Sequence, residues 1–146
     1  MSPSTSPLVS ALVPVFNGET FLAQALDSAL AQTMDSLEVI VVNDGSTDGS
    51  GDIARRYASS HPGRFVYVEQ PNAGLPSARN AAIRVARGRY LALLDSDDIW
   101  LPEHLATVAS VLEADSSLAL GHTNITFVGQ DGRPIDRPRD RRPSRP

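Results

Sequence analysis

Two hydrophobic patterns alternate along the chain. The first is a short, nearly continuous apolar run of strand length, and it occurs at residues 8–13, 37–43, 64–69 and 91–94. The second places apolar residues every three or four positions, as in an amphipathic helix, at about residues 19–32, 50–60, 76–87 and 102–114. Regular alternation of strand and helix is typical of a parallel sheet whose right-handed crossovers place helices on both faces. We therefore predict an α/β fold with a mostly parallel sheet.

The details of these runs lead to further predictions. The run 91–94 has no polar alternation, so we predict a strand that is buried on both faces. Pro14 is expected to close the first strand, and Gly88 is expected to end the third helix, as glycine often does. Two further strand candidates are shorter, at residues 118–120 and 125–128.

Polar loops follow three of the predicted strands. Asn17 lies after the first strand, Asp44 after the second, and Asp95, Asp97 and Asp98 after the run 91–94. Parallel strands of an open sheet end at a common rim, and ligands bind in the crevice beyond these ends. We therefore expect these side chains to lie near one another.

The three acids after the run 91–94 carry the clearest chemistry. Carboxylates this close repel one another unless a cation or hydrogen-bond donors hold them, and hard divalent cations prefer oxygen ligands. Asp95, Asp97 and Asp98 therefore predict a site for Mg²⁺ or Mn²⁺ that is shared with a substrate phosphate. The alternative is that one of these acids only caps the helix that begins near Leu101-Pro102-Glu103.

Composition narrows the classes of function. The chain has 146 residues, the size of one domain, and a formal net charge of −4. Six Arg and two Asp in residues 133–146 give a local charge of +4, which leaves −8 on residues 1–132. An acidic body repels a phosphate backbone, so we expect no nucleic-acid partner. The chain has no Cys, which excludes disulfides, thiolate metal sites and Cys nucleophiles.

The two ends of the chain differ from its body. Residues 1–7 are rich in Ser and Pro, and residues 133–146 are rich in Arg and Pro, so both are predicted to be disordered. The basic tail is either a solvated segment or a contact for anionic lipid or nucleic acid. No apolar run reaches the roughly 20 residues that cross a bilayer, and no secretory signal is visible. We expect a cytoplasmic protein, with peripheral association at the inner face of the membrane left open.

Four motifs, in order, resemble those of the family 2 glycosyltransferases. They are residues 9–17 with Phe21-Leu22, residues 41–48 (Val-Val-Asn-Asp-Gly-Ser-Thr-Asp), residues 74–80 (Gly-Leu-Pro-Ser-Ala-Arg-Asn) and residues 94–102 (Leu-Asp-Ser-Asp-Asp-Ile-Trp-Leu-Pro). The resemblance covers about residues 8–135. It implies a GT-A fold, in which a Rossmann-like half binds a nucleotide-diphosphate sugar, most often a UDP-sugar. Residues 8–132 would form this donor domain.

The resemblance places the nucleoside beside the first two strands. The backbone of Pro14 and Val15 would lie at the base and ribose, and Asp44 would hydrogen-bond the base. A carboxylate at a base edge accepts from an imide N–H, which favours uracil or thymine over cytosine. The alternative for Asp44 is a cap on the helix that begins near Ser50, and we interpret Asp48 as such a cap.

The resemblance also assigns the diphosphate end of the donor. Asp95 would lie near the ribose, Asp97 would be the main metal ligand, and Asp98 would help to bind the metal or the sugar. Arg79 would approach the nucleotide or its diphosphate, where a guanidinium forms a charge-assisted fork on phosphate oxygens. The alternative for Arg79 is a surface position on its helix.

The resemblance ends before the acceptor half. Family members invert the anomeric centre, and their general base comes from the acceptor-binding half, for which we find no candidate here. Residues 127–135 look like the hairpin that follows the donor half. The prediction is therefore a donor domain truncated before the acceptor half, whose acceptor and homo-oligomeric state the sequence leaves open. The competing prediction is a non-catalytic nucleotide-sugar-binding module or an inactive fragment.

Overall fold

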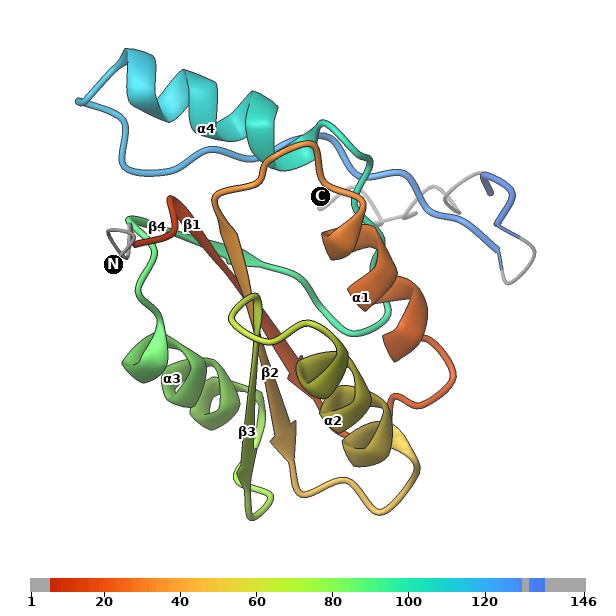
Figure 1. The fold of residues 1–146 in the computed structure, drawn as a ribbon. Coiled ribbons are helices and arrows are strands. Elements are labelled where there is room, and N and C mark those ends of the chain that lie inside the picture. The colour runs from red at the N-terminus through yellow and green to blue at the C-terminus, as the bar shows by residue number, and fades with distance from the viewer. Residues whose placement is uncertain (1–5, 130–131, 136–146) are drawn as a thin grey trace, which may run out of the picture.

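A computed structural model describes residues 6–129 and 132–135 of the chain. Strands and helices alternate through it, as the hydrophobic pattern predicts (Figure 1). The strands are β1 (Val9–Val15), β2 (Leu37–Asp44), β3 (Phe65–Gln70) and β4 (Tyr90–Leu93). The helices are α1 (Leu22–Leu30), α2 (Ser50–Ser60), α3 (Leu75–Val85) and α4 (His104–Ala114).

The four strands form one parallel sheet in the order β3-β2-β1-β4. The chain first steps outward from β1 to β3, and then crosses back over β1 and β2 to add β4 on the other side. The strand order therefore reverses between β1 and β4. In an open α/β sheet, this reversal opens a crevice at the carboxyl ends of the strands, and ligands bind there.

Alternate residues of the central strands face two hydrophobic layers. Odd-numbered residues of β1 and β2 pack against α1 and α2, in a cluster that includes Leu22, Leu26 and Ala54. Even-numbered residues, among them Leu12 and Ile40, pack against α3 on the opposite face. Every residue of β1 and β2 is buried, because both faces of the central strands are covered (Figure 1).

Pro14 lies inside β1, although the sequence predicts that it closes the strand. The carbonyls of Leu8 and Leu12 accept hydrogen bonds from Tyr90 and Leu94, so even-numbered residues of β1 turn their backbone groups toward β4. Because β4 ends opposite Leu12, no described strand faces the nitrogen of Pro14. The missing N–H therefore costs no ladder hydrogen bond, as at a strand edge.

The prediction that the run 91–94 is buried on both faces is wrong for two of its residues. Leu94 is buried, but Leu91 is 47% exposed and Leu93 is 56% exposed. β4 is an edge strand of the described sheet, and α3 packs mainly on β1 and β2, so one face of β4 remains uncovered. An unbroken apolar run thus marks a strand here without marking two covered faces.

Gly88 does not end α3 as predicted. α3 ends at Val85, and Gly88 lies two residues after its C-cap, Ala86, with no positive φ. A Cβ at Gly88 would come within 2.4 Å of the backbone nitrogen of Ser10. Glycine is needed at this position because the turn into β4 passes directly against β1.

The short strands predicted at residues 118–120 and 125–128 do not form. Residues 118–128 are exposed and lie outside the described sheet, and strands need a paired neighbour to be stable. At the place of the predicted hairpin, the described residues on either side of 130–131 form an antiparallel bridge. Val128 bridges Pro134, and the N–H of Ile135 donates to the carbonyl of Phe127 at 2.9 Å.

The predictions of disorder fall mostly outside the described residues. Residues 1–5 of the predicted N-terminal segment and residues 136–146 of the predicted tail are not described, so both predictions stay open. Among the described residues, the helices are too short or too polar to cross a membrane.

Candidate functional site

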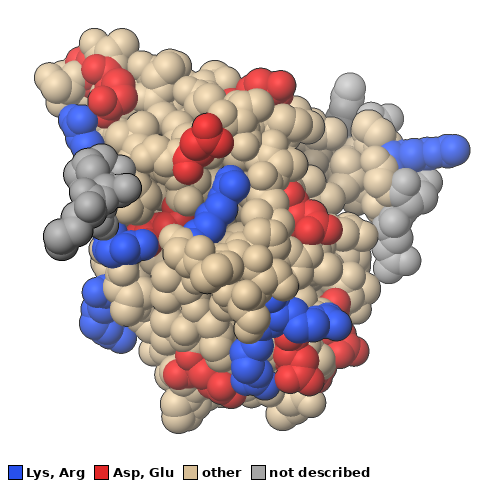
Figure 2. Space-filling model, viewed as in Figure 1, with Lys and Arg blue, Asp and Glu red and all other residues tan. Residues whose placement is uncertain are grey.

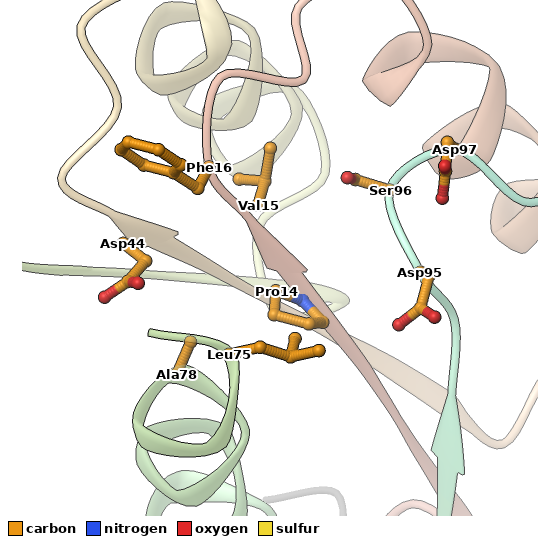
Figure 3. A pocket seen from close by; sticks show the side chains of 9 residues that line it. All are labelled: Pro14, Val15, Phe16, Asp44, Leu75, Ala78, Asp95, Ser96 and Asp97. Atoms are coloured by element: carbon orange, nitrogen blue, oxygen red, sulfur yellow. The ribbon is translucent and has the colours of Figure 1, made fainter. Parts of the chain in front are cut away.

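A cavity of about 260 Å³ opens at the carboxyl ends of β1, β2 and β4 (Figure 3). It lies at the point where the strand order reverses, as expected for an open sheet of this kind. β1 and the residue after it contribute the floor, the end of β2 contributes one wall, α3 another, and the loop after β4 a third. The lining residues are Pro14, Val15, Phe16, Asp44, Leu75, Ala78, Asp95, Ser96 and Asp97.

The cavity brings together most of the residues that the sequence singles out. Asp44 and Asp95 lie on opposite sides of Pro14, because β2 and β4 flank β1 (Figure 3). Pro14, Val15 and Asp97 also line the cavity. The expectation that the loops after the three strands share one rim is therefore confirmed.

Asp44 is buried, and its carboxylate holds the loop that leads into α3. Oδ1 accepts from Gln70 Nε2 at 2.6 Å and from the N–H of Ala73 at 2.9 Å, and Oδ2 accepts from the N–H of Gly74 at 2.8 Å. Burial alone would raise the pKa of Asp44, but these three donors outweigh it and hold the pKa below its usual value of 3.8. Asp44 therefore does not cap α2. It anchors the β3–α3 loop and stays ionised.

Glycine is required at the point where this loop meets Asp44. Gly74 adopts a φ of 86° as it enters α3, a left-handed conformation that side chains rarely tolerate. This conformation turns the amides of Ala73 and Gly74 toward the carboxylate.

The loops after β1 and β2 brace each other. Asn17, with a φ of 51°, accepts from the N–H of Thr47 at 2.8 Å and donates its own N–H to Ser46 Oγ at 3.0 Å. Asp48 accepts from the N–H of Ser50 at the start of α2, and also from the N–H of Glu19. Asn17 and Asp48 thus shape the loops at the rim. Asp48 is predicted to cap α2, and it accepts from the N–H of Ser50 although Gly49 takes the N-cap position.

Arg79 reaches the acids from α3 and is not a free surface residue. Its Nη2 lies 2.8 Å from Asp95 Oδ1, and the two side chains are 32% and 47% exposed. The Nε of Arg79 is buried without a hydrogen-bond partner among the described residues. One guanidinium therefore neutralises one of the three acids and keeps an unused donor.

Asp97 and Asp98 lack such a counterion among the described residues and are both exposed. Partial burial and the nearby charges of Asp97 and Asp95 raise the pKa of Asp98 above 3.8. A bound cation would offset this excess negative charge. Among the described residues, no group of three or more His, Cys, Asp or Glu surrounds a common point. Two carboxylates nevertheless fit Mg²⁺ or Mn²⁺, since a magnesium-type site usually takes one or two carboxylates and completes its shell with water and substrate phosphates.

Several lining residues escaped the sequence analysis. Phe16 and Leu75 are 52% and 47% exposed and form apolar walls, and Ser96 lies between the acids. Gln70 also supports Asp44. An apolar residue in a polar loop is the one signal that could have pointed to Phe16. Gln70 carried no signal, because its partner lies 26 residues away.

Charges on the surface are mixed. On the face shown in Figure 2, acidic and basic side chains lie next to one another rather than gathering into one basic area. Arg55 pairs with both Asp52 and Glu69, and Arg89 pairs with Glu113. This face therefore offers no broad basic surface to a phosphate backbone.

The sequence profile described as Glycosyl transferase family 2 matches residues 10–145. Among curated proteins, chondroitin synthase of Escherichia coli is 36% identical to the chain over 129 residues. The match covers 88% of the chain and 19% of the synthase. The chain thus spans a small part of this relative.

Two solved structures are similar to the chain in both fold and sequence. A mannosyltransferase from Pyrobaculum calidifontis, PcManGT, was solved in complex with GDP-Man and Mn²⁺ and is 34% identical, with a TM-score of 0.68. S. aureus TarS 1–349 in complex with UDP is 30% identical, with a TM-score of 0.67. The chain is covered to 75% and 73% in these comparisons, and the larger chains to 33% and 32%.

Proposed function

Since this chain belongs to glycosyltransferase family 2, we propose that it binds a nucleotide-diphosphate sugar in the cavity at the carboxyl ends of β1, β2 and β4. One observation carries the proposal. The cavity is lined on one side by the buried, ionised carboxylate of Asp44 and on the other by Asp95 and Asp97, and Arg79 pairs with Asp95. A nucleotide sugar has complementary ends, a base with N–H donors and a diphosphate.

The base would lie between the Asp44 wall and the apolar side chains of Phe16 and Leu75. A carboxylate has about four acceptor positions, and three donors from the protein already occupy three of those on Asp44. One position is left, on Oδ2. Uracil offers a single N–H at its imide edge, whereas guanine offers two adjacent donors that call for both oxygens. The remaining position favours UDP over GDP.

The diphosphate would lie at Arg79 and the acids. The backbone of Pro14 and Val15 would pass along the base and ribose, with Asp95 near the ribose. Asp97 and Asp98 would hold Mn²⁺ or Mg²⁺, and a divalent cation bound there would offset the charge that develops on the diphosphate leaving group. The guanidinium of Arg79, which pairs with Asp95 through Nη2, would add a positive charge beside the phosphate oxygens.

The whole protein would then transfer the sugar to an acceptor hydroxyl with inversion. This step needs a base next to the acceptor, and we assign none among the described residues. The activity, the sugar and the acceptor therefore belong to the proposal, because the chain spans about a third of the two solved relatives.

Calorimetric titration tests the donor site. UDP is titrated into the protein with Mn²⁺, and the titration is repeated with EDTA and with GDP. We expect saturable binding of UDP that is lost with EDTA and is weaker with GDP. A folded protein that binds neither nucleotide would contradict the donor site and leave an inactive fragment as the better interpretation.

A single substitution then tests the metal ligands. Asp97→Ala should abolish the Mn²⁺-dependent part of UDP binding and leave the fold intact, because Asp97 is exposed and supports no described element. Asp35→Ala is the matched control, since Asp35 is also an exposed acid but precedes β2 at the opposite end of the sheet. Equal UDP affinity in wild type and Asp97→Ala would refute the metal assignment.

A further inference from the structure

The acid loop, residues 95–103, is held at both ends. At its start, the N–H of Leu94 donates to the carbonyl of Leu12 at 3.1 Å, which continues the pairing of β4 with β1. At its far end it is attached to α1 and the turn that follows it. The positions of the acids between these two attachments therefore depend on α1 as well as on the sheet.

Gln32 is the central contact at the far end. Its side chain is buried, at 6% exposed, and lies just after α1. Nε2 donates to the carbonyl of Leu101 at 2.8 Å and to the carbonyl of Ser28 at 3.1 Å, while Oε1 accepts from the N–H of Leu105 at 3.0 Å. One amide thus ties α1 to the acid loop and to the first turn of α4.

Two neighbouring contacts support the same attachment. The N–H of Thr33 donates to the carbonyl of Pro102 at 3.0 Å, and the N–H of Trp100 donates to Ser28 Oγ at 3.2 Å. The indole of Trp100 packs against the core and stacks on His104, with ring centroids 5.1 Å apart. The loop therefore has a defined path over α1.

The acids need such an attachment because they repel one another. Arg79 pairs with Asp95, while Asp97 and Asp98 have no ion pair within the described part of the chain. Like charges drive a loop toward conformations in which they are further apart. Hydrogen bonds to buried partners oppose this, and they fix the carboxylates before a cation arrives, as outer partners do in metal sites.

We propose that Gln32 is a positioning residue for the acid loop, which holds Asp97 and Asp98 where they can take the cation of a metal–nucleotide complex. The inference rests on the proposed donor site. A primary amide suits this position because it donates and accepts at the same time. Leucine of similar size can do neither, and glutamate cannot donate to two carbonyls when it is ionised.

The test compares wild type with Gln32→Leu by two measurements. The first is the affinity for Mn²⁺ and for UDP with Mn²⁺, which we expect to weaken about tenfold or more, as when a partner of a metal ligand is removed. The second needs no ligand. Trp100 is the only Trp of the chain, so its emission reports the placement of the acid loop. We expect emission at longer wavelength and stronger quenching by acrylamide in Gln32→Leu.

Ser10→Ala is the control for a general loss of stability. Ser10 is fully buried, donates to Glu38 Oε1 and accepts from the N–H of Gly88, near the opposite end of the sheet. We expect it to lower the unfolding temperature while Mn²⁺ affinity and Trp100 emission stay as in wild type.

The outcomes separate the two proposals. If wild type binds Mn²⁺ and UDP and Gln32→Leu binds them equally well with unchanged Trp100 emission, Gln32 is only a structural residue and the inference is overturned. If wild type binds neither, the donor site itself fails, and the metal role of Gln32 fails with it. If Gln32→Leu does not fold, Ser28→Ala removes the hydroxyl that accepts from the N–H of Trp100 and donates to the carbonyl of Ala25 within α1. It must then weaken Mn²⁺ binding and shift Trp100 emission for the inference to stand.

Discussion

Asp44 and Glu38 are two carboxylates of β2 that face α3, one near each end of the strand. Glu38, 1% exposed, accepts from Ser10 Oγ, from the backbone N–H of Arg87 and from its guanidinium. Hydrogen-bond donors surround both carboxylates, and they offset the free-energy cost of removing the two charges from water. The two carboxylates differ in whether an acceptor position remains free for a ligand. Asp44 lines the cavity and keeps an acceptor position, whereas Glu38 has a structural role at the other end of α3.

Gln70 supplies the one side-chain donor among the three that occupy acceptor positions of Asp44 in the described residues. Gln70→Ala removes one of the two donors on Oδ1 and frees an acceptor position beside the one on Oδ2. We expect the preference for UDP over GDP to fall by about three- to tenfold, the worth of one hydrogen bond. Competition calorimetry measures it. Gln24→Ala, on the exposed side of α1, is the matched control. An unchanged preference would contradict the acceptor-position argument for uracil.

At the scale of elements, β4 and the acid loop join the two halves of the site. The pairing of β4 with β1 ends at Leu93 and Leu12. Only the face of β4 that points toward α1 is covered by other residues. The loop after it then crosses to α1, where Ser28 and Gln32 hold it. The sheet thus sets where the loop begins, and the helix sets where it ends.

Two adjacent leucines test this one-sided burial. Leu94→Ala should lower the free energy of unfolding by about 2–5 kcal/mol, because its side chain is 1% exposed in the core. Leu93→Ala should cost about 1 kcal/mol or less, because that side chain is 56% exposed on the uncovered face. Urea unfolding of the two variants gives both numbers. Equal losses would mean that the outer face of β4 is covered in solution.

For the whole molecule, carboxylates that accept several hydrogen bonds set the response to acid. The pKa values of Glu38, Asp44 and Asp48 are held below the usual 4.5 for Glu and 3.8 for Asp, because hydrogen-bond donors outweigh the effect of burial in each case. As the pH falls, the unfolded chain takes up protons at these groups before the folded chain does. The stability they contribute is complete above the usual values and is lost below them. Asp98 acts in the opposite direction, since its pKa is raised.

We therefore expect the free energy of unfolding to decline as the pH falls below about 4.5 and to keep declining toward the lower pKa values of the folded protein. Urea titrations between pH 3 and pH 7, on the order of one unit apart, follow this loss. Asp44→Asn should be less stable at neutral pH and show a shallower decline in acid, because one titrating group is gone. A wild-type stability that does not change down to pH 3 would contradict the linkage.

Local patterns in the sequence were enough to predict the strand–helix alternation, the parallel sheet and the common rim. These properties follow from the period of apolar residues and from the place where each strand stops, and both are written within a few neighbouring positions. The four motifs identified the family, and the acids with Asp44 located the cavity. The pattern of a single apolar run does not show whether another element covers both faces of the strand. Leu91 and Leu93 were wrongly predicted to be buried for this reason.

Only the tertiary structure decided which donors reach Asp44, where Arg79 points and what holds the acid loop. Gln70 and Asp44 are 26 residues apart, Arg79 and Asp95 are 16 apart, and Gln32 meets Leu101 across 69 residues. A Gln or an Arg has no local signature for such a partner, since the pairing depends on the order in which the strands enter the sheet. The sequence by itself determined the elements and the chemistry of the rim. The crossover from β3 to β4 decided how those side chains meet, because it places β4 and the acid loop beside β1.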